Sequence, residues 1–351
     1  MNLRLKLILG ISVAILLGIV KLSAQETWLE RHLTAVGSFL DDRAKAGLDT
    51  NFLAPPKHGF MVAATTSFAG INTTVKGNDI PTYKDLHIHM KSGLNGNVAL
   101  AVGYRAISVK YSFNISSGYS RNFNFSFLNN SVGIEFRRHS ADGMHGYMDA
   151  SATPKIANVN KGDTRLNATI INGYFVFNSR RYSLPAAMGN GLIQKRSSGS
   201  VTVYGLYLNA DLNAKNEMLS AMLGGLKKLE FYQAAAGIGY GYNYTPNRGK
   251  LLLHASAAPL VVFFTRSFVT AAIDFPLPDG TSINTEILKS VDPKHKIFLT
   301  AVARASAVYN INDHFILSLN ALLNDVQFNS AIGLKVGMND WIATGTVCYR
   351  F

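Results

Sequence analysis

The sequence has a single cysteine, Cys348, so no disulfide bond can form within the chain. Only 16% of the residues are charged, against about 25% in an average soluble domain. After the first 24 residues no apolar run reaches about 18 residues, and the mean hydropathy is only +0.11. These absences argue against a disulfide scaffold, a typical soluble domain and a bundle of membrane helices.

The first 24 residues have the layout of a secretory signal peptide. Arg4 and Lys6 precede an uncharged apolar stretch, residues 7–20, which is too short to cross a bilayer comfortably. Ala24 supplies a small residue for cleavage before Gln25. Lys21 leaves the alternative of an uncleaved membrane anchor, whereas a lipoprotein is excluded because no cysteine lies near this point.

Acidic residues are scarce, which gives the chain a net charge of +13. The first 24 residues contain three of the cations and no acid, so the remainder carries about +10. Such an excess suits nucleic acid, but an exported protein rarely meets it. We expect outer-membrane lipids or lipopolysaccharide as partners and no nucleic acid; the alternative is surface charge that binds nothing in particular.

Residues 25–57 differ from the rest and predict a short amphipathic N-terminal helix, with a loosely ordered leader as the alternative. Apolar residues recur there at helical spacing: Leu29, Leu33, Val36 and Leu40. We expect the helix to end near Gly47, and Pro55 and Pro56 to close the segment.

Residues 58–351 alternate between apolar and polar side chains with period two. The clearest runs are 86–91, 107–115, 122–127, 237–244, 297–303, 315–319 and 341–351. Their polar face is mostly Ser, Thr, Asn and Gly, and aromatic residues gather at the ends of the runs. This pattern predicts an all-β fold, an antiparallel transmembrane β-barrel of about 12 strands, with 10 to 14 possible. We expect turns at 93–96, 129–130, 246–249, 310–313 and 339–340, and long outward loops at 140–164, 211–228 and 265–293.

The last run predicts a closing strand with one face toward lipid. The residues expected to face lipid are Trp341, Ala343, Gly345, Val347, Tyr349 and Phe351. Those expected to face inward are Ile342, Thr344, Thr346, Cys348 and Arg350. The run resembles the signal that outer-membrane barrels present to the barrel-assembly machinery, with Trp341, Val347, Tyr349 and Phe351 as its apolar residues.

Candidate sites for chemistry are weak. His87 and His89 share one strand face, but no third metal ligand is identifiable, so we expect them to line a wet lumen and expect no metal or cofactor. His139 and Ser140 point to opposite faces of a strand, and no G-x-S-x-G motif is present, so no enzyme is expected. Cys348, with no second cysteine, is interpreted as a structural thiol.

The connection between two runs near residue 180, here called the basic connection, is dense in cations. They are Arg180, Arg181, Lys195 and Arg196. Arginine is well suited to hold a phosphate or carboxylate, so we predict an anion-binding site here. The alternative is that these cations brace a folded loop.

The same stretch resembles a known family. The resemblance rests on Tyr174, Val176–Asn178, Arg181–Ser183, Pro185–Ala187, Gln194–Ser197 and Gly199–Ser200, together with Gly103–Arg105. These motifs are similar to those of the exported proteins grouped as domain of unknown function 4421, and the resemblance covers roughly residues 58–351. It implies an outer-membrane β-barrel and brings no activity with it.

We therefore expect a Gram-negative outer-membrane protein, exported by its signal peptide. The function expected is a narrow pore or a carrier for small, hydrophobic or anionic molecules. One alternative is a non-catalytic barrel subunit that docks other envelope proteins. A third is an envelope-lipid hydrolase.

Overall fold

A computed structural model describes residues 47–77, 86–92, 95–104, 107–115, 120–142, 144–150, 153–189, 191–222, 225–276, 282–291, 298–329 and 334–351. The signal peptide and the helix predicted within residues 26–46 lie outside these ranges. Within them, no helix is long and apolar enough to cross a bilayer.

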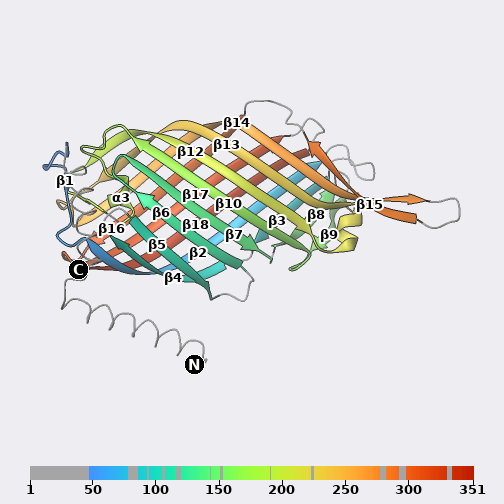
Figure 1. Ribbon diagram of the computed structural model, residues 1–351, viewed down its shortest axis with the longest axis horizontal. Coiled ribbons are helices and arrows are strands. Elements are labelled where there is room, and N and C mark those ends of the chain that lie inside the picture. The colour runs from blue at the N-terminus through green and yellow to red at the C-terminus, as the bar shows by residue number, and fades with distance from the viewer. Residues whose placement is uncertain are drawn as a thin grey trace, which may run out of the picture. The chain divides into compact units, whose positions relative to one another are not determined.

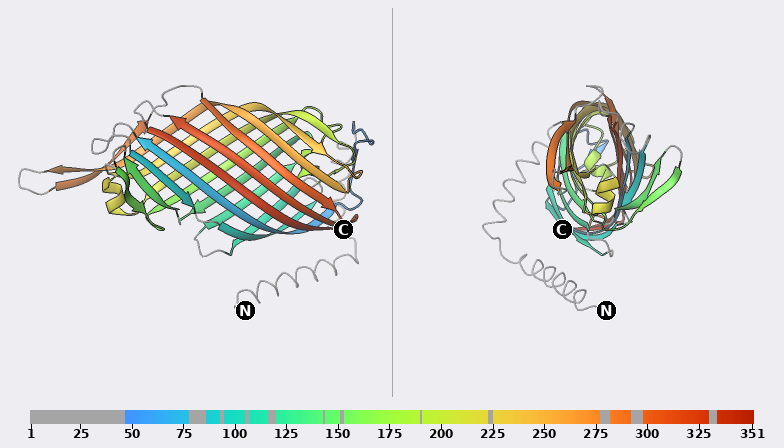
Figure 2. Two further views of the ribbon diagram at one scale, coloured as in Figure 1. Left: turned by 180° about the vertical axis from the view of Figure 1, so that it is seen from behind. Right: turned by 90° about the vertical axis from the view of Figure 1, so that its right-hand side faces the viewer.

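Twelve antiparallel strands form a closed ring (Figure 1). They are β2 (Phe60–Gly77), β4 (Asn95–Tyr104), β5 (Ile107–Asn114), β6 (Ser120–Leu128), β7 (Val132–Ala141), β10 (Thr164–Val176), β12 (Ser198–Ala214), β13 (Leu226–Tyr244), β14 (Leu251–Pro276), β16 (Phe298–Asn310), β17 (Phe315–Asn329) and β18 (Leu334–Arg350). β18 pairs with β2 from Leu334↔Gly77 to Arg350↔Met61, which closes the wall (Figure 2). The predicted all-β barrel of about 12 strands is confirmed.

Further strands lengthen the wall at the end away from the C-terminus. β3 (Leu86–Ser92) and β4 pair with the same edge of β2, and Asn95 and Gly96 lie inside β4, so these two residues of the turn predicted at 93–96 belong to a wall strand. β8 (Met144–Ala150) pairs with β3 and with β9 (Thr153–Val159). β15 (Ser282–Val291) forms with β14 a hairpin that projects from this end (Figure 1).

The predicted long loops were therefore partly wrong, because residues 140–164 and 265–293 contain strands, and 211–228 contains strand ends and α4 (Glu217–Met222). The turn predicted at 339–340 was also wrong. Both residues lie inside β18, where Asp340 points into the barrel and is buried. Two adjacent polar residues between apolar ones predict a turn, but here Asp340 places a charge inside the lumen.

The short connections lie at the end of the barrel where the chain terminates. They are residues 129–131, 245–250 and 311–314. The basic connection lies at the same end and carries α3 (Leu184–Ala187) and β11 (Ile193–Gln194), which pairs with β1 (Leu53–Ala54). Barrels of this type place short turns toward the periplasm and longer connections outside.

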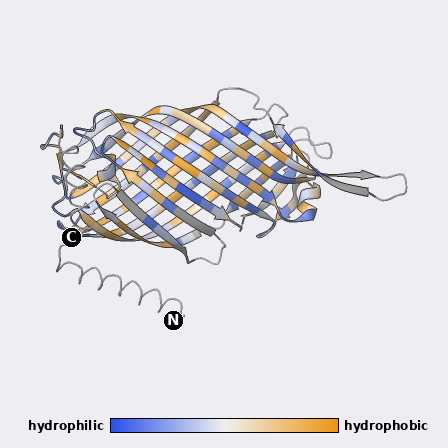
Figure 3. Cartoon of the chain, viewed as in Figure 1, coloured by the Kyte–Doolittle hydropathy of each residue, from blue (hydrophilic) through white to orange (hydrophobic). Residues whose placement is uncertain are grey.

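The half of the wall nearer the C-terminus carries an apolar belt on its outer face. Its most exposed members include Val102, Ile238, Phe263, Leu299, Leu319 and Val347. Tyrosine and phenylalanine rim the belt at the chain-terminal end: Tyr242, Tyr244, Phe315, Tyr349 and Phe351. Aromatic girdles beside an apolar band are typical of strands that cross a bilayer. Figure 3 shows the alternation along the strands as a chequered pattern.

Beyond the belt, the outer face of the wall becomes polar and the inner face becomes apolar. On β12 the outward residues change from Val201 to Asn209 and Asp211, while the inward residues change from Thr202 to Leu208. The interior at the far end is apolar and includes Val75, Met90, Leu166, Phe231, Val326 and Phe328. A wall that leaves the bilayer follows the rule of soluble proteins and buries its apolar face.

This exchange corrects the prediction for His87 and His89. Their neighbours Leu86, Ile88 and Met90 point inward and are buried, so the two histidines lie on the outer face of the wall and not in the lumen. The period-two pattern identified the two faces of the strand, but which face is wet depends on the side of the belt on which the strand lies.

The closing strand matches its prediction where exposure separates the faces. Val347, Tyr349 and Phe351 are exposed, whereas Cys348 and Arg350 are buried. The Trp341 indole lies over Gly70 of β2, where a Cβ would overlap it. Whether these residues form an assembly signal stays a prediction.

Candidate functional site

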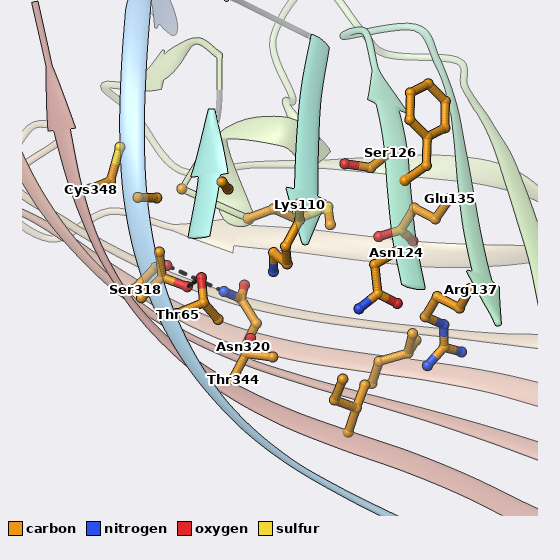
Figure 4. Close-up of a pocket in the computed structure, with 18 of the residues that line it drawn as sticks. Thr65, Lys110, Asn124, Ser126, Glu135, Arg137, Ser318, Asn320, Thr344 and Cys348 are labelled. Atoms are coloured by element: carbon orange, nitrogen blue, oxygen red, sulfur yellow. Dashed lines mark hydrogen bonds between the residues drawn. The ribbon is translucent and has the colours of Figure 1, made fainter. Parts of the chain in front are cut away.

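A cavity of about 140 Å³ lies inside the barrel at the level of the belt and is here called the chamber. Residues of β2, β4, β5, β6, β7, β16, β17 and β18 line it, together with Met188 and Gly189 (Figure 4). Its polar lining is mostly neutral and includes Thr65, Asn124, Ser126, Asn320, Thr344 and Thr346. Hydroxyl and amide groups of this kind can bind a small polar solute without a fixed charge of their own.

Two ion pairs cross the lumen beside the chamber. Glu135 of β7 is paired with Arg304 of β16, and four strands separate them along the shorter arc of the ring. Arg137 of β7 donates to Asp340 of β18 over 3.0 Å, again across four strands. The Asp340 carboxylate also accepts a hydrogen bond from Asn324 at 3.1 Å. These pairs tie opposite walls together through the space a solute would have to cross.

Lys110 gives the chamber an excess of positive charge. Lys110, Arg137 and Arg304 face Glu135 and Asp340, so three cations meet two carboxylates. Figure 4 shows Lys110 between the side of Thr65 and Asn320 and the side of Asn124. Its ammonium group makes no hydrogen bond or ion pair within the part of the chain that the structure describes. It is therefore the cation best placed to bind an anion.

Residues 182–189 and 191–194 fold into the chain-terminal end of the lumen and are here called the plug. Tyr182 to Ala187 are buried, and Figure 1 places α3 within this end of the barrel. Ser306 of β16 donates to the Ala187 carbonyl at 2.5 Å, and Arg350 of β18 donates to the Gly191 carbonyl at 3.5 Å. Arg304 also contacts Met188 Sδ at 3.3 Å, so the plug rests on the ion pairs.

Gln194 is the main anchor of the plug and is buried. Its Oε1 accepts hydrogen bonds from Ser183 N and from Asn243 Nδ2, both at 3.0 Å. Its Nε2 donates to the carbonyls of Arg181 at 2.6 Å and Arg196 at 2.8 Å. These bonds hold both ends of the plug together, which gives a structural reason for Gln194 in the motifs of residues 174–200 that carry the family resemblance, here called the signature block.

The plug needs a glycine opposite Tyr182. The Tyr182 hydroxyl lies against Gly241 of β13, where any Cβ would overlap it. Gly241 thus leaves room for the plug, whereas a Cβ at Gly237 or Gly239 would meet the neighbouring strand β14. Tyr240 and Tyr242 face outward.

A serine, a histidine and an asparagine meet beneath the plug. His254 Nδ1 lies 2.9 Å from Asn243 Oδ1, and His254 Nε2 lies 3.1 Å from Ser256 Oγ. The residues needed for a hydrolytic triad are thus present. From the sequence, His139 and Ser140 were considered instead, and this group was not identified. The sequence signal was the spacing His254-x-Ser256 within one strand. All three side chains are buried, and Asn243 also donates to the Ser183 carbonyl of the plug at 2.9 Å.

The basic connection braces a neighbouring segment with two of its four cations. Arg181 pairs with Asp49 at 3.0 Å, and its guanidinium lies 5.1 Å from the centre of the Phe52 ring. Lys195 Nζ donates to the Thr50 carbonyl at 2.9 Å. Arg180 and Arg196 are exposed at the same rim. The bracing role is thus observed for Arg181 and Lys195, and anion binding by the four stays a prediction.

The remaining predicted sites have these positions. Cys348 is buried and lines the chamber. Among the described residues, no three of His, Cys, Asp and Glu lie close enough to hold a metal ion. The charged residues of the lumen were not predicted from the sequence. The clearest sequence signal for them was Arg304, a cation on a strand whose other face is mostly alanine.

Comparison with solved structures finds other barrels at low similarity. The outer-membrane protease OmpT of Escherichia coli matches at 10% identity with a TM-score of 0.44, over 85% of this chain and 98% of that one. A mutant of the monoaromatic hydrocarbon channel TodX matches at 6% identity and 0.24, over 84% and 91%. Ail of Yersinia pestis, bound to a heparin analogue, matches at 10% and 0.19, over 83% and 99%.

These scores are too low for function to be argued from the matches, and no curated protein sequence matches the chain. The model of one family, described as a domain of unknown function (DUF4421), matches residues 47–351. The chain belongs to this family.

Proposed function

We propose that the protein is an outer-membrane barrel whose lumen, closed at rest, binds a small anionic solute and acts as a narrow pore or carrier for it. The apolar belt with its aromatic rim supports the membrane placement. The signal peptide expected from the sequence supports export. A structural role in an envelope complex remains the alternative.

The single observation that carries the solute class is Lys110 in the chamber. Three cations face two carboxylates there, and the lysine has no hydrogen-bonding partner among the described residues. A cavity near 150 Å³ holds a molecule of about the size of benzene, so the chamber of about 140 Å³ suits phosphate or a short carboxylate. Larger solutes would have to displace the plug or the ion pairs.

Closure at both ends argues against a permanently open channel. The plug fills the chain-terminal end, and the apolar core around Phe231 and Phe328 fills the other. Access to the chamber therefore requires one of these two seals to move, and passage through the barrel requires both. Conductance in planar bilayers tests this: we expect rare, brief openings, and a steady large current would contradict the closed lumen.

Binding is tested with Lys110→Met on the detergent-solubilised protein, using inorganic phosphate and acetate as probes in calorimetry. Losing one charge-assisted contact should weaken binding by about tenfold or more. Lys250→Met is the matched control, because Lys250 lies in the turn before β14, outside the chamber. Equal binding by the two variants would exclude Lys110 as the anion ligand.

Ester hydrolysis is a second candidate, favoured by the hydrogen bonds that join Ser256, His254 and Asn243. Because the plug covers this group and uses Asn243 itself, we expect a structural role, with no covalent labelling of Ser256 by a fluorophosphonate. Labelling that disappears in Ser256→Ala, together with loss of esterase activity in the same variant, would establish the hydrolase instead.

A further inference from the structure

The outer wall beyond the belt carries an open cavity of about 650 Å³. It lies over β2, β3, β8 and β9, on the face of the wall that points away from the lumen. Ligand pockets usually fall between about 300 and 1,000 Å³. The cavity is thus large enough for a disaccharide-sized headgroup.

The register of the strands arranges its side chains in rows. Asn72, Lys91 and His145 are cross-strand partners in the first row, nearest the belt. Thr74, His89, Tyr147 and Asn158 form the second row. Neighbouring strands lie about 4.8 Å apart, so one ligand can reach several side chains of a row.

Two carboxylates offset only part of the positive charge at this surface: Asp149 lies 3.9 Å from His89 Nε2, and Asp163 accepts a hydrogen bond from Asn160 N. Lys91 and Lys161 line the cavity, and Lys76 stands directly opposite Lys335 in the next row. None of these four lysines forms an ion pair within the described ranges. Like charges placed opposite each other on a sheet, as Lys76 and Lys335 are, destabilise it. An anion bound beside these lysines would therefore stabilise this wall.

Neutral groups in the cavity suit a sugar. Asn72, Asn158 and Asn160 can both donate to and accept from hydroxyl groups. Tyr147 and His89 have ring centres 5.0 Å apart, and this pair offers an aromatic surface for a sugar ring. Amide, aromatic and ammonium groups together match a ligand that carries both hydroxyls and phosphate.

The cavity begins where the belt ends. On β2 the outward positions run from the exposed Phe68, through Gly70 under Trp341, to Asn72. Two residues along a strand span about 7 Å, which puts Lys91 and His145 at the height expected of lipid headgroups. With the chain termini toward the periplasm, this side of the membrane is the outer leaflet.

We infer that this cavity binds the phosphorylated sugar headgroup of an outer-leaflet glycolipid, as in lipopolysaccharide. Lys91 and Lys161 hold the phosphate, and the asparagines hold the sugar hydroxyls. The inference rests on the proposed placement in the outer membrane, and it is independent of the solute bound in the chamber.

The test is native mass spectrometry of the purified full-length protein with diphosphorylated lipid A. We expect Lys91→Gln/Lys161→Gln to reduce the bound fraction by about tenfold or more. Lys227→Gln/Lys289→Gln removes the same charge elsewhere at this end and should bind as wild type. Equal loss in both double variants, or unchanged binding in the first, would overturn the site.

Further probes separate the possible ligands. Dephosphorylated lipid A should bind at least tenfold more weakly, and inorganic phosphate alone should not compete at equal concentration. Equal binding of the dephosphorylated lipid, or full competition by phosphate, would overturn the proposed ligand. Separation of inner and outer membranes tests the placement independently, and the Lys110 binding assay tests the chamber, so these ideas can fail separately.

Discussion

Replacing Glu135 by Gln removes one of the two carboxylates that balance the charge of the chamber. Three cations would then face Asp340 alone, which raises the net charge there from +1 to +2. Arg304 is left without its partner while its side chain is only 6% exposed. Breaking a buried ion pair from one side costs about 3–5 kcal/mol, and we expect Glu135→Gln to lie in this range.

Arg304→Met should cost less, although it breaks the same pair. Glu135 then keeps Lys110 and Arg137 nearby, and the net charge of the chamber falls to zero. We expect about 1–3 kcal/mol for this variant. The double variant returns the net charge to +1, so its cost should be no greater than that of Glu135→Gln alone. The two single costs should therefore exceed the cost of the double variant by about 1–3 kcal/mol, which is the coupling energy.

The assay is reversible urea unfolding of the barrel in lipid vesicles, followed by tryptophan fluorescence. Trp341 lies in the barrel wall over Gly70 and reports its loss. Glu230→Gln is the matched control, because Glu230 is paired with Lys228 on the outer face and should cost less than about 1 kcal/mol. The reasoning is refuted if the two chamber variants add without coupling, or if Arg304→Met costs more than Glu135→Gln.

Three other outcomes are expected. Gln194→Leu removes the hydrogen bonds that hold both ends of the plug, so openings in planar bilayers should become about tenfold more frequent, unlike in the exposed control Gln327→Leu. Neutralising all four cations of the basic connection should weaken co-purification of anionic lipid while the barrel stays folded; unchanged lipid would leave them a bracing role. Burial raises the pKa of Asp49, but hydrogen bonds from Asn51 and from Arg181 outweigh it and lower the pKa below 3.8. Because the folded-state pKa is lowered, the contribution of this contact to stability is present above pH 3.8 and is lost as the pH falls through the lowered value, so hydrogen exchange of residues 49–54 should rise only in that acidic range.

Sequence patterning was sufficient for the barrel because alternation is a local property. In β13 each tyrosine from Tyr240 to Tyr244 faces outward as expected, since period two assigns faces without knowledge of any partner strand. It failed for His87 and His89, because a strand that leaves the bilayer keeps its alternation and exchanges its wet and dry faces. The position of the belt is a property of the whole ring and is not encoded in seven residues of β3.

The lumen was harder to predict because its contacts join distant residues. Glu135 and Arg304 are 169 positions apart, and Arg137 and Asp340 are 203 apart. In the sequence, each of these charged residues only interrupts an apolar alternation, which is why a turn was wrongly predicted at Asp340. Ring closure is what turns these isolated charges into pairs.

The signature block gains a physical meaning from the same closure. Tyr182, Ser183 and Gln194 make their contacts within the plug and with Gly241 and Asn243 of β13, and none of them faces solvent. A motif buried in this way describes how the lumen is sealed, whereas the solute would be selected by Lys110 and the neutral groups around it. Members of the family could therefore share the seal and differ in the solute. Comparing which residues occupy positions 110, 135 and 304 among members that retain Gln194 and Asn243 would test this division: if those lumen positions varied no more than the seal does, chamber and seal would have to be parts of one function.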